Sequence, residues 1–105
     1  MKNEEITTVL TTKFQYSRDG AELIADKIHC AKHEIQDAFF RFLEFSVLPD
    51  ITFEDVHIKQ LIDEYDMDPI AALLTMDWIT RDPKKAKASL KKGIDKPMFR
   101  YSKES

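Results

Sequence analysis

The chain has 105 residues, of which 43% are hydrophobic and 33% are charged, with one cysteine, two glycines and four prolines. This length suits one domain, and so few turn-forming residues disfavour an all-β fold. The lone Cys30 excludes an intramolecular disulfide and favours a reducing compartment. No apolar stretch is typical of a signal peptide or of a membrane-spanning helix, so we expect a cytoplasmic protein without membrane contact.

Charge is divided unequally along the chain. Residues 1–80 contain seven basic and sixteen acidic side chains, a formal charge of −9, whereas residues 81–105 contain nine basic and three acidic ones, a formal charge of +6. Opposite charges on one small protein favour binding, either of another molecule or of the basic segment to the acidic body.

Apolar side chains recur at helical spacing near the N-terminus. Ile6, Val9, Leu10 and Phe14 predict a helix over about residues 3–15. Four threonines interrupt this pattern, and because β-branched side chains lose rotamer freedom in helices, a strand is the alternative.

The longest helical pattern covers residues 20–45. Asp19 as N-cap and Glu22 three residues later resemble a capping box. One apolar stripe then continues without a break until Pro49; it contains Ile24, Ile28, Ala31, Ile35, Ala38, Phe39 and Phe42. Such a helix would be about 40 Å long. We expect the stripe to be buried and the polar face, which carries Asp26, His33 and Asp37, to be exposed.

Local capping patterns predict three further helices. Thr52 as N-cap with Asp55 in the box position predicts a helix over 53–64. Asp-Pro pairs then predict a helix over 68–80 and another over 82–93, ending at Gly93. The 68–80 helix is apolar nearly all round, so we expect it to be central, with Trp78 in the core.

These elements predict an all-α fold. We expect a small bundle of four or five helices packed around the long amphipathic helix of residues 20–45, with no significant sheet. Residues 1–93 would form one helical domain and residues 94–105 a partly flexible C-terminal tail. Because the last helix offers few apolar side chains, we predict that the basic segment is a mobile arm that contributes little to the fold.

Few residues suggest chemistry. His29 and His33 are four residues apart and would share a helix face, as paired metal ligands do, but a solvated polar face explains them better. With no phosphate-binding glycine loop or nucleophile motif, we expect no enzyme and no cofactor. Asp77 would form a surface ion pair with Arg81 or, if buried, would need a partner.

Two features suggest binding. The last helix presents Lys84, Lys85, Lys87, Lys91 and Lys92, which suit phosphate contacts and are poor at reading base edges. Phe40 lies nearly opposite the apolar stripe, so it either faces a partner or is covered by residues 47–51.

The sequence therefore predicts a small cytoplasmic, non-enzymatic interaction protein, a regulator or adaptor. The alternative is an accessory nucleic-acid-binding protein that contacts phosphates through residues 81–100. A metal-dependent helical-bundle enzyme is a distant third. The expected partner is another protein, and homo-oligomerisation is left open.

Overall fold

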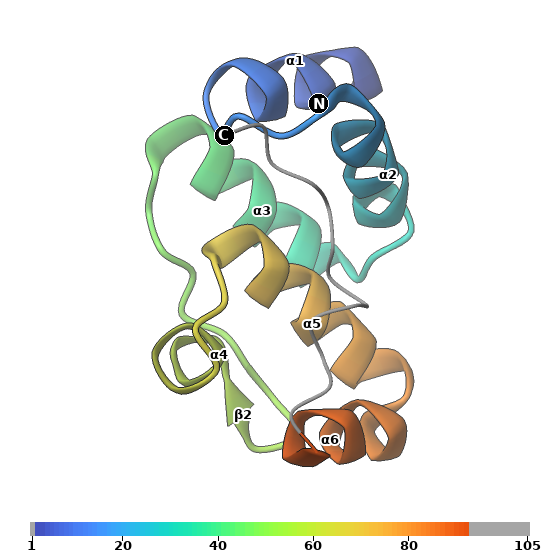
Figure 1. The fold of residues 1–105 in the computed structure, drawn as a ribbon, viewed down its shortest axis with the longest axis vertical. Helices are drawn as coiled ribbons and strands as arrows, with labels where there is room; N and C mark the ends of the chain where they lie inside the picture. The colour runs from blue at the N-terminus through green and yellow to red at the C-terminus, as the bar shows by residue number, and fades with distance from the viewer. Residues whose placement is uncertain (1, 93–105) are drawn as a thin grey trace.

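The computed structural model describes residues 2–92, and within them it contains six helices and one small antiparallel sheet (Figure 1). The elements are α1 (Asn3–Thr12), α2 (Arg18–His29), α3 (His33–Phe45), β1 (Thr52–Phe53), β2 (Val56–His57), α4 (Ile58–Glu64), α5 (Pro69–Arg81) and α6 (Pro83–Lys92). The predicted helical class is confirmed, whereas the predicted number of four or five helices is too low for residues 2–92, because residues 20–45 form two helices. The predicted tail of residues 94–105 and the helix end at Gly93 lie outside the described residues.

Helix α5 lies at the centre of the molecule (Figure 1). Its start follows the Asp-Pro pattern, because an Asp68 carboxylate oxygen accepts a hydrogen bond from the Ala71 N–H at 2.9 Å. Nine of its residues are buried, and the helix packs against α3, α4, α6 and β1. The predicted central position of this helix is therefore confirmed. Trp78 is only half-buried at the edge of the core, so its predicted core position is wrong.

Residues Asn3–Thr12 form helix α1, so the N-terminal segment is a helix and not the alternative strand. Ile6 and Leu10 are buried, and α1 packs against α2. The threonines do not prevent the helix, because the Thr11 and Thr12 hydroxyls donate to the Thr8 carbonyl at 3.1 and 2.6 Å. These bonds lie in the last turn, where the helix ends at Thr12.

The predicted single helix over residues 20–45 is wrong, because α2 ends at His29 and α3 begins at His33. The predicted faces are nevertheless confirmed. Ile28, Ile35, Phe39 and Phe42 are buried, whereas Asp26, His33 and Asp37 are exposed. The predicted N-cap is also wrong: Ser17, not Asp19, caps α2, since its hydroxyl accepts from the Gly20 N–H at 3.1 Å.

The break between α2 and α3 agrees with the size of the fold and is stabilised by side-chain hydrogen bonds. A helix of about 40 Å would exceed the longest dimension of the folded chain, which is 33 Å. The carbonyls freed at the break have side-chain donors. The Gln36 amide donates to the His29 and Ala31 carbonyls, both at 3.1 Å, and Arg81 Nη2 donates to the Cys30 carbonyl at 2.6 Å. These carbonyls therefore remain hydrogen-bonded where the chain turns back.

A β-hairpin replaces the predicted start of the 53–64 helix. Phe53 pairs with Val56, and the two residues between them, Glu54 and Asp55, have φ angles of 49° and 66°. Positive φ at both central residues is the pattern of a type I′ turn, which suits the twist of a hairpin. Helix α4 begins only at Ile58, where His57 serves as its N-cap. The Thr52–Asp55 capping pattern was therefore misleading.

Helix α6 is part of the core rather than a mobile arm. Ala86 and Leu90, four residues apart on one face, are buried in the same cluster as the apolar residues of α5, whereas Ala88 is exposed. The prediction that the basic segment contributes little to the fold is therefore wrong for Pro83–Lys92. The reason is that the apolar surface of α5 needs cover, which α6 provides.

Asp77 combines the two alternatives proposed for it. The residue is only 8% exposed, yet its Oδ2 pairs with Arg81 Nε at 3.0 Å. Its Oδ1 is buried and has no hydrogen-bond partner among residues 2–92. Since Arg81 also bonds to the Cys30 carbonyl, one guanidinium serves both a buried carboxylate and the α2–α3 break.

Tyr16, which lies between α1 and α2, contacts Asp68 at the start of α5. Its side chain is 3% exposed, and its hydroxyl lies 3.1 and 3.2 Å from the two Asp68 carboxylate oxygens, to which it donates. Burial, the negative charge of Asp68 and this hydrogen bond all raise the pKa of Tyr16. The phenol is therefore held in its neutral, donating form.

We predict that Tyr16→Phe lowers the free energy of unfolding by about 2 kcal/mol, because a hydrogen bond to a charged acceptor is lost. Urea unfolding followed by circular dichroism measures the change. Tyr65→Phe is the control, since Tyr65 is half-buried and carries the same hydroxyl. An equal effect of the two variants would contradict a special role for the Tyr16–Asp68 bond.

The same contact predicts a pH dependence. An ordinary tyrosine titrates near pH 10. Because the folded-state pKa of Tyr16 is raised, its stabilising contribution is complete below about pH 10, the ordinary value, and is lost progressively as pH rises from there towards the folded-state value. Unfolding curves measured between about pH 9 and pH 11 should show a steeper loss for wild type and Tyr65→Phe than for Tyr16→Phe.

Arg81→Gln should lower the free energy of unfolding by about 2 kcal/mol, because it leaves the buried Asp77 carboxylate without its cation and the Cys30 carbonyl without its donor. Arg18→Gln is the matched control. It removes an ion pair of the same i,i+4 spacing, Arg18–Glu22, that is exposed and should contribute less than about 0.5 kcal/mol. Equal stability of the two variants would refute the stabilising role of the Arg81 contacts with Asp77 and the Cys30 carbonyl.

Candidate functional site

Three large apolar side chains are exposed within four residues at the end of α3. Phe45 is 66% exposed, Val47 51% and Leu48 56%, and we refer to these three as the apolar patch. Leu23 on α2 is another exposed large apolar side chain, with 54% of its surface accessible, but it is distant from the patch in sequence. Helix α3 ends here because Ser46 adopts a left-handed conformation, from which its N–H donates to the Phe42 carbonyl at 2.9 Å.

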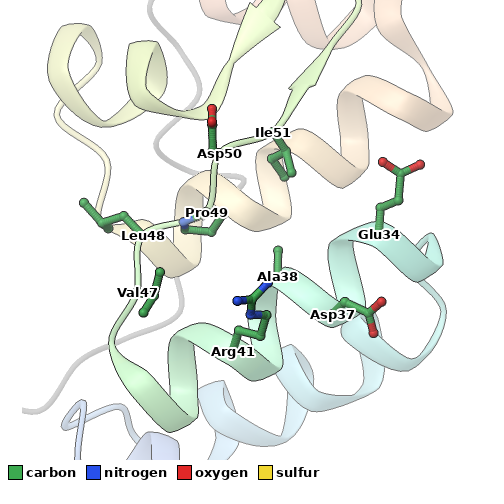
Figure 2. A pocket seen from close by; sticks show the side chains of 9 residues that line it. All are labelled: Glu34, Asp37, Ala38, Arg41, Val47, Leu48, Pro49, Asp50 and Ile51. Carbon is green, nitrogen blue, oxygen red and sulfur yellow. The ribbon is translucent and has the colours of Figure 1, made fainter.

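Residues 47–51, which we call the link, run back beside α3 and enclose with it an open groove of about 390 Å³ (Figure 2). Ala38 of α3 and Ile51 of the link point toward each other across it. The lining residues come from both elements; they are Glu34, Asp37, Ala38, Arg41, Val47, Leu48, Pro49, Asp50 and Ile51. The groove therefore combines an apolar floor with three carboxylates and one guanidinium.

A second hollow of about 360 Å³ continues along α3. It is lined by Asp37, Phe40, Arg41 and Glu44, so Asp37 and Arg41 border both hollows. Phe40 is half-buried and packs edge-on against Phe39, with ring centroids 6.0 Å apart. The candidate partner-binding residue Phe40 therefore lies beside the groove, where its ring belongs partly to the core and partly to the surface.

His57 fixes one side of the groove. Its Nε2 lies 2.5 Å from Asp50 Oδ1, and its Nδ1 accepts a hydrogen bond from the Lys59 N–H at 3.0 Å. Because Nδ1 accepts, we assign the ring proton to Nε2, which donates to Asp50. Both ring nitrogens are thus occupied, so this histidine holds the link against the start of α4 instead of offering a free base.

The two candidate metal ligands do not share a helix face. His29 ends α2 and His33 begins α3, because the break lies between them. His33 instead lies 3.6 Å from the Asp37 carboxylate on the exposed side of α3. Among residues 2–92 no group of three histidine, cysteine, aspartate or glutamate side chains is arranged to hold a metal ion.

The candidate lysines lie on α6. Lys84, Lys85, Lys87 and Lys91 are exposed, while the side chain of Lys92 lies outside the described part. An Asp82 carboxylate oxygen accepts from the Lys85 N–H at 3.3 Å and so supports the start of the helix. In Figure 1, α6 lies at the opposite end of the long axis from α1.

Sequence reasoning identified Phe40 and the possibility that residues 47–51 cover it, but it missed the groove. The available signal was the unusually apolar connection from Phe45 to Ile51, which contains few polar residues for a surface loop. That signal does not show against which helix the connection packs. Its position beside α3 follows from the attachment of β1 to α5.

None of the helices in the described part is long and apolar enough to cross a membrane. Comparison of the chain with protein-family models, with curated proteins and with solved structures finds no significant match.

Proposed function

We propose that this protein is a small, non-enzymatic interaction module, a regulator or adaptor that binds a partner protein through the apolar patch and the adjoining groove. The observation that carries this proposal is the exposure of Phe45, Val47 and Leu48, each more than half accessible, within four residues. Large apolar side chains grouped at a surface and bordered by charges are typical of protein-binding sites.

The surroundings of the patch support binding rather than catalysis. The groove is lined mainly by aliphatic side chains, and the histidine beside it has both nitrogens engaged. We place this function in the cytoplasm, because the single cysteine, Cys30, is exposed and unpaired, which suits a reducing compartment.

We predict that Val47→Ser combined with Leu48→Ser abolishes capture of the partner by the tagged protein. Both side chains are exposed, so their truncation removes apolar contact area with little effect on stability. Quantitative mass spectrometry of captured proteins measures the loss. Leu23→Ser is the matched control, because it removes an equally exposed leucine from α2 and should leave capture unchanged.

Two results would contradict the proposal. Proteins captured equally by the wild type and the double variant would show that the patch is not the contact. Loss of all captured proteins after nuclease treatment would show that nucleic acid bridges them.

A second candidate function is nucleic-acid binding, and α6 is the reason to retain it. Ala86 and Leu90 anchor the helix to the core, so its exposed lysines are presented by a packed element. Lys84, Lys85, Lys87 and Lys91 form no ion pair with the described part of the chain. Lysines in such a position can hold phosphates without reading sequence.

If this second function is correct, the protein binds duplex DNA of unrelated sequences, and affinity falls steeply between about 50 and 200 mM salt. Lys84→Gln with Lys87→Gln should reduce the slope of log affinity against log salt by about 2. Lys27→Gln with Lys59→Gln, which alters the charge equally on α2 and α4, should not. Fluorescence anisotropy measures both, and absence of binding at the lower salt concentration would exclude this function.

A further inference from the structure

We propose that the segment of the partner that enters the groove is basic and amphipathic. It would place an apolar side chain on the floor between Ala38 and the link, and lysine or arginine side chains opposite the bordering carboxylates. This partner chemistry rests on the proposed function and makes it more specific.

The shape of the groove favours a side chain rather than a separate small molecule. Its volume of about 390 Å³ is near the lower end for ligand sites, and it continues into the apolar patch at Val47 and Leu48. A polypeptide can fill the groove with one apolar residue while neighbouring residues cover the patch. Such a combination uses the whole apolar surface at this end of α3.

Charge complementarity selects a basic segment. Among the described residues that line the groove, Glu34, Asp37 and Asp50 are the acids and Arg41 is the one cation, so these four side chains carry a formal charge of −2. Residues 1–92 as a whole contain 13 basic and 17 acidic side chains, a formal charge of −4, so the net charge of the folded part has the same sign as that of the groove. A cationic segment would therefore be attracted during approach, and an acidic one would be repelled.

The positions of these charges set a direction. Figure 2 shows Val47 and Leu48 at one end of the groove and Glu34 and Asp37 at the other, with Arg41 between them. A lysine next to Arg41 would be repelled. The partner is therefore expected to place its apolar residues toward Val47 and Leu48 and its basic residues toward Glu34 and Asp37.

The test uses the full chain and a synthetic amphipathic peptide of about fifteen residues, with leucines at helical spacing and lysines at the other positions. A second peptide has glutamates in place of the lysines. In a heteronuclear NMR titration the lysine peptide should shift the resonances of Ala38, Val47 and Ile51. The glutamate peptide should bind at least about tenfold more weakly.

Two charge variants separate the groove from general attraction. Glu34→Gln with Asp37→Asn should weaken the lysine peptide about threefold to tenfold, since two exposed charge pairs are lost. Asp63→Asn with Glu64→Gln is the matched control. It changes the net charge of the protein equally on the exposed end of α4 and should change affinity less than about twofold.

Equal weakening by the two variants, or equal binding of the two peptides, would overturn the partner chemistry. So would nuclear Overhauser contacts from Val47 or Ile51 to residues 93–105, since the chain's own basic tail would then occupy the groove. A dimer that Val47→Ser with Leu48→Ser dissociates would assign the groove to a second copy. If either peptide result fails while these serine substitutions still abolish protein capture, the proposed function stands and only the chemistry of the partner is wrong.

Discussion

The apolar circumference of α5 is the constraint on which the rest of the structure depends. A helix that buries nine residues needs cover on every side, and α3, α4, the hairpin and α6 together supply it. Its one carboxylate, Asp77, is consequently buried and needs a cation, which Arg81 provides one turn later. The same guanidinium reaches the Cys30 carbonyl, so a requirement of α5 also stabilises the turn between α2 and α3.

The groove is a consequence of this packing. Helix α3 and β1 both pack against α5, and the link that connects them lies beside Glu34, Asp37 and Arg41 on the exposed side of α3. Along this path Val47 and Leu48 are exposed. The apolar surface is therefore produced by the connection between two elements that pack against α5, not by a separate structural unit.

The link is held by hydrogen bonds at both of its ends before any partner binds. The helix end at Ser46 is closed by a hydrogen bond to the Phe42 carbonyl, and the other end of the link is held by the Ile51 carbonyl, which accepts from the Ile58 N–H at 3.1 Å. The Asp50–His57 contact adds a side-chain tie. A binding surface ordered in advance loses less conformational entropy on association, which favours the groove as a docking site.

The sequence by itself determined the helical class, the Asp-Pro starts of α5 and α6, the central place of α5 and the buried stripe that includes Ile35 and Phe39, because these depend on residues within one or two turns. Tertiary structure decided the break after His29, the hairpin at residues 52–57 and the path of the link. Arg81, which stabilises the break, is 51 residues from Cys30 in sequence. Likewise, the capping pattern at Thr52 is outweighed by the packing of β1 against α5, a contact that no local pattern encodes.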